Sequence, residues 1–176
     1  NGIRPAFYYE DEEVVVVASE RPVIQTAFNL QAEQIKEIKP GHAVIVRKDG
    51  SLSEEEVTPP APRKSCSFER IYFSRGSDMD IYRERIKLGK SIVPAVMKSV
   101  NGDLENSVFS FIPNTAEVAF FGMMKGLEDY LNDRKQEKIL ELGDRLTPES
   151  LHEILQMRPR MEKIAVKDAK LRTFIT

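Results

Sequence analysis

The chain has 176 residues, of which 41% are hydrophobic and 31% charged, and its formal net charge is -2. This length is enough to bury one hydrophobic core or two partial ones. The balanced charge gives no general attraction to nucleic acid, and no apolar run approaches the ~20 residues that span a bilayer. We therefore expect neither a nucleic-acid partner nor a membrane. The single cysteine, Cys66, predicts a reducing, cytoplasmic compartment.

Both ends of the sequence read as interrupted. The chain opens on Asn1–Pro5 without an initiator Met, and it closes on the apolar stretch Arg172–Thr176. Natural ends are more often polar and frayed. We therefore expect an internal piece of a longer protein.

The first third of the chain is predicted to be rich in β-structure. Aromatic and β-branched runs separated by an acidic turn predict a hairpin. The four valines Val14–Val17 indicate a strand that is buried on both faces. Lys48–Gly50 is typical of a hairpin turn, and Pro22 suits the first turn of a helix. The expected elements are strands at Ala6–Tyr9, Val14–Ala18 and Ala43–Arg47, and a helix at Arg21–Phe28.

A linker is expected at Ser51–Lys64. Glu54–Glu56 form a charge run typical of a solvated segment, and Pro59–Pro62 favour an extended, stiff backbone. We place a domain boundary here, between a unit at residues 1–64 and a unit at residues 65–176.

The second unit is predicted to alternate helices and strands. Apolar and aromatic residues alternate over Cys66–Phe73. Ser77 is expected to cap a helix whose stripe of mostly apolar residues runs over Ile81–Val96, and Gly89 and Pro94 weaken this helix. The other expected elements are strands at Val108–Ile112 and Lys163–Val166, a helix at Ala116–Leu142, and a shorter helix from Thr147 and Pro148 to Met157.

The segment Phe109–Glu117 is expected to run from a strand through a tight loop into a helix. Asn114, with Glu117 three residues later, resembles a capping box. The free N–H groups at such a helix start can hold a phosphate, and Thr115 adds a hydroxyl donor. The alternative, an ordinary helix cap without a ligand, is the commoner outcome of this local pattern.

Two further candidate sites have weaker signals. Lys167, Lys170 and Arg172 form a basic cluster that can pair with phosphates or simply be solvated. Cys66 has no base next to it in the sequence and no second soft ligand in the chain. A small buried side chain is therefore favoured for Cys66 over a nucleophile or a metal ligand.

Several motifs of the first unit resemble those of class II glutamine amidotransferases. Gly2–Pro5 matches their GIRP-type turn, and Ala18–Glu20 matches the end of a strand that closes on ASE. Glu37–Gly41 is similar to their EIxPG turn. Several enzymes share these motifs, including asparagine synthetases.

The second unit narrows the resemblance to the glutamine phosphoribosylpyrophosphate amidotransferases. Cys66–Arg75 is similar to their C-x-F/M-E-Y-I-Y-F-x-R segment, and Arg83–Gly89 is similar to their ARxNLG helix. Ile112–Thr115 resembles their pyrophosphate loop. Lys167–Ile175 resembles their flexible loop, although it lacks the family's Tyr and is one residue shorter. The motifs follow the family's order over essentially the whole chain.

The resemblance implies a mixed α+β and α/β fold. The C-terminal part of an Ntn-hydrolase sandwich is joined to the first part of a phosphoribosyltransferase-like α/β domain. It also implies an enzyme of purine synthesis, in which an N-terminal cysteine hydrolyses glutamine and the ammonia displaces pyrophosphate from phosphoribosylpyrophosphate to give 5-phosphoribosylamine. We expect Mg²⁺, phosphoribosylpyrophosphate and glutamine as ligands of the full-length protein, and we expect a homo-oligomer.

The family's nucleophile and its ribose-phosphate loop would lie outside this sequence. We therefore expect no catalytic residue and no metal ligand in the chain, and no activity of the chain alone. The implied substrate-binding residues are Asn114 and Thr115 in the pyrophosphate loop, and Lys167 and Arg172 in the flexible loop. Cys66 matches an iron–sulfur ligand position of some members, but members without the cluster have this cysteine too, so we expect no cluster.

Two other functions are also compatible with the sequence. One is a non-catalytic relative that uses the loop only to bind phosphate or nucleotide. The other is a different class II glutamine amidotransferase, against which the Cys66–Arg75 segment argues.

Overall fold

The computed structural model describes residues 2–167 and 174–175 as a mixture of helices and strands. The chain divides into two compact units, unit 1 at residues 1–81 and unit 2 at residues 82–176. The division falls inside helix α2 (Met79–Ser91). Unit 1 therefore includes residues that the sequence assigns to the second domain.

Unit 1 is built on a small antiparallel sheet with the strand order β2-β1-β3. Its strands are β1 (Phe7–Glu10), β2 (Val15–Ala18) and β3 (Lys36–Glu37). The first hairpin is confirmed, because Phe7 lies opposite Ala18 and Glu10 lies opposite Val15. Helix α1 (Arg21–Phe28) is also confirmed and has a proline in its first turn, and a short 3₁₀ turn, η1 (Ala32–Gln34), leads to β3.

The expectation that the valine strand is buried on both faces is wrong for this structure. Helix α1 covers the face of the sheet that carries Tyr9, whose ring lies 6.0 Å from that of Phe28. Val15 and Val17 point to the opposite face, because side chains alternate along a strand, and 56% of Val17 is exposed. Among the described residues of unit 1, only one face of β2 is therefore shielded.

The second hairpin joins β4 (His42–Val46) to β5 (Leu52–Glu56) through the predicted turn at residues 48–50. The predicted linker therefore begins too early, since its first residues form a strand. Cross-strand pairing explains the difference: Arg47 binds Glu55 at 2.6 Å, so the acidic run has partners instead of only solvent. Residues 57–66, which include the prolines, form neither helix nor strand.

The alternating segment after the linker forms a π-helical turn, η2 (Glu69–Phe73), not an extended strand. The rings of Phe68, Tyr72 and Phe73 pack together there, with centroids 5.2 to 5.6 Å apart. Side chains four and five positions apart come together only when the backbone is helical. The packing of the three rings therefore outweighs the alternating pattern of apolar residues.

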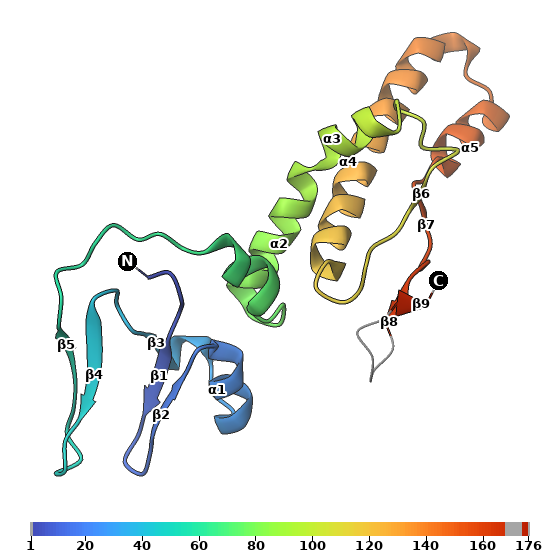
Figure 1. Ribbon diagram of the computed structural model, residues 1–176. Helices are drawn as coiled ribbons and strands as arrows, with labels where there is room; N and C mark the ends of the chain where they lie inside the picture. The colour runs from blue at the N-terminus through green and yellow to red at the C-terminus, as the bar shows by residue number, and fades with distance from the viewer. Residues whose placement is uncertain (1, 168–173, 176) are drawn as a thin grey trace. The chain divides into compact units, whose positions relative to one another are not determined.

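Unit 2 is mainly helical. Helices α2 and α3 (Val93–Ser99) run beside the long helix α4 (Glu117–Leu142) (Figure 1). The predicted stripe is interrupted at Ile92, where α2 ends and Pro94 enters the first turn of α3. A 3₁₀ turn, η3 (Gly143–Arg145), precedes α5 (Pro148–Gln156). As predicted, Thr147 caps α5, and its hydroxyl accepts the N–H of Ser150 at 3.2 Å.

The strands of unit 2 are short and form two pairs. β6 (Val108–Phe109) and β7 (Arg160–Met161) are parallel, which is typical of a crossover through intervening helices. β8 (Val166–Lys167) and β9 (Phe174–Ile175) are antiparallel. The strand predicted at 108–112 is therefore too long. The strand predicted at 163–166 is displaced. The ladder between β6 and β7 ends after Phe109. There the N–H of Ile164 donates to the hydroxyl of Ser110 instead of to a backbone carbonyl.

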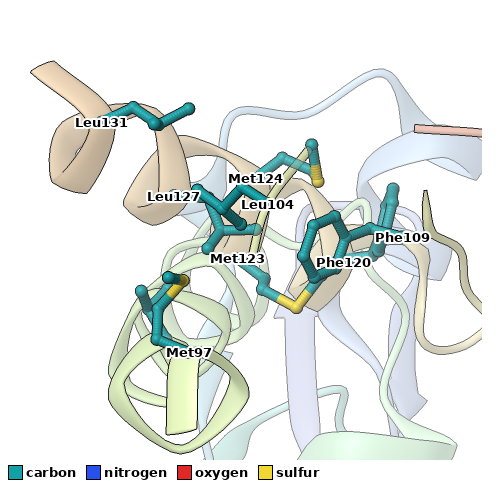
Figure 2. Packing of buried hydrophobic residues seen from close by; sticks show 9 residues of the cluster. Met97, Leu104, Phe109, Phe120, Met123, Met124, Leu127 and Leu131 are labelled. Atoms are coloured by element: carbon teal, nitrogen blue, oxygen red, sulfur yellow. The ribbon is translucent and has the colours of Figure 1, made fainter. Parts of the chain in front are cut away.

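The core of unit 2 gathers around α4. Leu127 is fully buried, and Figure 2 shows the side chains of Phe120, Met123 and Met124 directed toward residues from α3, β6 and the connection between them. The buried cluster comprises Val93, Met97, Leu104, Phe109, Phe120, Met123, Met124, Leu127 and Leu131. This core fixes the start of α4, which follows the candidate phosphate loop.

Helices that could cross a bilayer are absent from the described part of the chain.

Candidate functional site

The candidate phosphate loop, residues 113–116, connects the segment after β6 to the first turn of α4. It is held at both ends by buried side chains. Pro113 is buried, and the ring of Phe111 lies 4.9 Å from the ring of Phe120 in the core. The Pro113–Asn114 peptide bond is cis. The loop is therefore placed by the core of unit 2.

The predicted capping box between Asn114 and Glu117 is wrong. Helix α4 has Ala116 at its N-cap position, and no side chain caps it. The backbone carbonyl of Asn114, not its side chain, accepts the Glu117 N–H at 3.2 Å. The side chain of Asn114 is thus left exposed and Thr115 is half-buried. Among the described residues, neither side chain has a hydrogen-bond partner.

The predicted basic residues are only partly described. Lys167 lies in β8 and is exposed, whereas Arg172 and Lys170 lie outside the described residues. The segment leading to Lys167 is tied to the strand before the loop. Glu162 donates its N–H to the carbonyl of Phe109 at 3.1 Å, close to the bond between Ile164 and Ser110. Asn114 and Thr115 therefore lie in one loop. Lys167 follows a segment, residues 162–164, that is hydrogen-bonded to the strand before this loop and to the residue after that strand.

Sequence reasoning missed the close packing of two helices behind the loop. A Cβ added to Gly89 of α2 would lie 1.8 Å from the carbonyl oxygen of Ala119, in the first turn of α4. A Cβ on Gly122 would lie 2.2 Å from the carbonyl oxygen of Ile86. Gly89 is therefore not only a weak point of α2, because it lets the two backbones touch. The glycines at positions 89, 122 and 126 are a sign of close helix packing. This sign can be used only when it is known which helices pack together.

A second polar cluster lies in unit 1, at the start of α2. The guanidinium of Arg21 donates to both carboxylate oxygens of Asp78, at 2.8 and 2.9 Å, and to Asp80 at 2.7 Å. Asp78 also accepts the N–H groups of Asp80 and Ile81, at 2.9 and 3.2 Å. Asp78, not the predicted Ser77, therefore caps α2.

The environment of this cluster favours the charged forms of its members. Burial alone would raise the pKa of Asp78, but the hydrogen bonds from Arg21 and from the N–H of Ile81 outweigh it, so the pKa of Asp78 lies below its usual range. The same pair, mainly through the hydrogen bond to Asp78, raises the pKa of Arg21 above its ordinary value. The pair is therefore fully ionised at neutral pH.

The thiol and the imidazoles do not form a recognisable reactive site. Cys66 is a free, half-buried thiol. His42 lies 3.1 Å from the carbonyl oxygen of Pro40, and His152 lies 2.7 Å from the amide nitrogen of Gln156. Among residues 2–167 and 174–175, no three His, Cys, Asp or Glu side chains come together as metal ligands. We assign none of these residues to a metal, and the absence of an iron–sulfur cluster stays a prediction.

A groove of about 740 Å³ in unit 2 is separate from the loop. It is bordered by α4 and by the segment after α5, and none of its lining residues belongs to residues 113–116. The lining residues are Tyr82, Phe121, Met124, Lys125, Glu128, Leu131, Asn132, Lys135, Met157, Arg158, Pro159 and Met161.

Comparison with known proteins gives three amidophosphoribosyltransferases. The chain is 32% identical to that of Lachancea kluyveri over 128 residues, which cover 66% of this chain and 24% of the relative. It is 30% identical to that of Saccharomyces cerevisiae over the same shares, and 27% identical to that of Pseudomonas aeruginosa over 68% of this chain and 25% of the relative. The resemblance to amidophosphoribosyltransferases is confirmed.

The match to amidophosphoribosyltransferases is partial. The chain spans about a quarter of the length of the curated relatives it matches, in agreement with an internal piece of such a protein. No protein-family model matches the chain. The three relatives have the same name and come from two yeasts and a bacterium, so the similarity extends across distant organisms.

Proposed function

We propose that the full-length protein is an amidophosphoribosyltransferase that makes 5-phosphoribosylamine from phosphoribosylpyrophosphate and glutamine-derived ammonia in purine synthesis. The observation that carries this proposal is the match to three proteins of that name. In the proposed reaction the ammonia nitrogen bonds to C1 of the ribose. The bond from C1 to the pyrophosphate oxygen breaks, and pyrophosphate leaves with the bonding pair.

In this proposal the two predicted domains, whose boundary differs from that between units 1 and 2, belong to different halves of the enzyme. Residues 1–64 are the end of an Ntn-hydrolase glutaminase sandwich, and residues 65–176 begin a phosphoribosyltransferase-like domain. The exposed face of β2, with Val15 and Val17, is then the face on which the second layer of the sandwich packs. Parallel pairing of β6 with β7 supports an α/β domain for the second part.

The proposed role of the loop at 113–116 is to bind the pyrophosphate group. Helix α4 has 26 residues, and its N-terminus presents backbone N–H groups and the positive end of the helix dipole. No side chain caps this helix, although the backbone carbonyl of Asn114 accepts the Glu117 N–H. Asn114 and Thr115 add an amide and a hydroxyl without a partner among the described residues, and Lys167 and Arg172 add positive charge in the flexible loop.

The remaining properties of the full-length protein follow from the same proposal. It is a cytoplasmic homo-oligomer that uses Mg²⁺ with its phosphate substrate and has no iron–sulfur cluster. The chain of 176 residues alone has neither activity, because the nucleophilic cysteine and the ribose-phosphate loop belong to other segments.

The phosphate-binding role predicts that Thr115→Ala weakens the binding of phosphoribosylpyrophosphate with Mg²⁺ to the full-length protein. A lost hydrogen bond to a charged group costs about 1.5–3 kcal/mol, so we expect a dissociation constant roughly 10- to 100-fold higher. Isothermal titration calorimetry measures it. Thr115→Ser, which keeps the hydroxyl, is the matched control and is expected to bind nearly as tightly as the wild type. Equal affinities of wild type and Thr115→Ala would contradict the role of this loop.

A further inference from the structure

The groove of unit 2 follows one face of α4, and all of its lining residues lie within this unit. Phe121 and Lys135 are its first and last lining residues on the helix, and they lie about 21 Å apart along the helix axis. A groove of about 740 Å³ that extends over this length is long and narrow. A segment of polypeptide therefore fits it better than a compact small molecule does.

The α4 residues that line the groove include a stripe with the spacing of a helix-packing seam. Consecutive members of this stripe are three and four positions apart in turn, and they are Phe121, Met124, Glu128, Leu131 and Lys135. This spacing places side chains on one side of a helix, where the side chains of a second helix can pack between them. Met124 and Leu131 are buried, whereas 43% of Phe121 is exposed. The stripe therefore continues the core outward and leaves room for a further helix.

The other apolar residues of the lining come from outside α4. They are Tyr82 of α2 and, in the segment after α5, Met157, Pro159 and Met161. Tyr82 is 44% exposed and Met161 is 52% exposed. Methionine side chains are flexible and polarisable, so they adapt to the aliphatic side chains of a partner. The apolar ridge of an amphipathic helix can therefore be covered by α4 and by this segment together.

The charged groups of the groove are mainly cationic. Among the described residues that line it, the cations are Lys125, Lys135 and Arg158, and the anion is Glu128. The chain as a whole has a net charge of -2, so this excess of positive charge is local. Lys125 and Arg158 have no hydrogen-bond or ion-pair partner within the described part of the chain, and Lys135 donates to the carbonyl of Leu155 at 3.3 Å. These cations are therefore available to the carboxylates of a bound partner.

We propose that this groove binds an acidic amphipathic helix of a partner protein. The apolar ridge of the helix packs on the stripe of α4 and on the segment after α5, as in other helix-in-groove complexes. Its flanking carboxylates pair with Lys125, Lys135 and Arg158. A helix of about 14 residues has the length of the groove. The surface does not include the phosphate loop, so the inference does not depend on the proposed function.

Fluorescence anisotropy with the full-length protein tests this binding. The probe is a labelled synthetic helix of about 14 residues, with leucines at alternating three- and four-residue spacing and glutamates beside them. A second peptide has glutamine in place of every glutamate. We expect the acidic peptide to bind roughly 10-fold more tightly than the glutamine peptide at low salt, and the difference to shrink as salt is added.

Two variants test the apolar and the charged contacts separately. Phe121→Ala removes the exposed ring of the stripe, and Arg158→Glu reverses an exposed charge. Each is expected to weaken binding of the acidic peptide roughly 5- to 30-fold, and Phe121→Ala is expected to weaken binding of the glutamine peptide as well. Leu140→Ala is the matched control, because Leu140 lies on the same helix, is 80% exposed and does not line the groove. It is expected to leave both affinities unchanged.

Saturable binding that is weakened in both variants and kept in the control supports the proposal. No saturable binding, equal affinity for the two peptides, or unchanged affinity of both variants would overturn it. Displacement of the acidic peptide by inorganic phosphate at constant ionic strength would indicate a site for simple anions and overturn the helical partner. A change of oligomeric state on Phe121→Glu, measured by analytical ultracentrifugation, would assign the groove to a second copy of the chain and also overturn the proposal.

Discussion

Gly89→Ala is expected to lower the free energy of unfolding of the chain by roughly 2–4 kcal/mol. The added methyl group would lie 1.8 Å from the Ala119 carbonyl oxygen and 2.7 Å from the Met123 nitrogen. Both are backbone atoms, so no side-chain rotation relieves the clash and the two helices must separate. The better helix propensity of alanine offsets only about 1 kcal/mol of this cost. Urea denaturation followed by circular dichroism measures the effect.

Gly126→Ala is the matched control for this substitution. It lies in the same helix pair, but the nearest atom to an added methyl is the Cγ2 of Val93, at 2.7 Å, which belongs to a side chain. The valine can shift, and the gain in helix propensity then compensates in part. We expect a change within about 1 kcal/mol. If Gly89→Ala is no more destabilising than Gly126→Ala, the close contact between α2 and α4 is wrong.

Asp78→Ala is expected to cost roughly 2–4 kcal/mol of stability at neutral pH, because it removes a helix cap and leaves Arg21 without its main partner. The folded-state pKa of Asp78 lies below its unfolded value, so its contribution is present above the unfolded pKa and is lost as the pH falls through the folded pKa. The difference between wild type and variant is therefore expected to be largest at pH 7 and to shrink below about pH 4.

The control for Asp78 is Glu137→Ala, which removes an exposed pair with Arg134 on α4. Such surface pairs contribute at most about 0.5 kcal/mol, and the effect should hardly depend on pH in the same window. Denaturant titrations of the wild type, Asp78→Ala and Glu137→Ala at pH 7 and at acid pH measure both effects. A cost of Asp78→Ala that is independent of pH would show that the carboxylate charge has no part in it.

Elements with strong local signals were predicted correctly from the sequence. The proline in the first turn of α1, the Thr147 cap of α5 and the hairpin turn before β5 each depend on residues close together in the chain. The bounds of α4 were also predicted to within one residue. These features need no knowledge of what packs against them.

The errors arose where distant contacts decide the structure. Leu52–Glu56 looks like a solvated linker until it pairs with β4, and the ring packing of Phe68 and Tyr72 winds a segment that alternates like a strand. The exposure of Val17 depends on which layers lie over the sheet, and local composition does not determine that.

At the candidate site, too, local features were predicted and distant contacts were not. The sequence located the loop at Asn114 and Thr115, because the strand, the Pro-Asn turn and the following helix are local features. It did not predict that a backbone carbonyl replaces the capping box, or that Gly89 touches the turn behind the loop. The pair between Arg21 and Asp78 joins residues 57 positions apart, and no spacing rule indicates such a pair.

We propose that the full-length protein joins glutamine hydrolysis to phosphoribosyl transfer, and one assay tests this directly. Purified full-length protein is mixed with glutamine, phosphoribosylpyrophosphate and Mg²⁺, and glutamate and pyrophosphate are measured together. We predict that both are released in equal amounts, and that omitting either substrate abolishes the release of pyrophosphate. Glutamate without pyrophosphate would indicate another class II amidotransferase. Release of neither product would contradict the account and favour a relative that only binds phosphate.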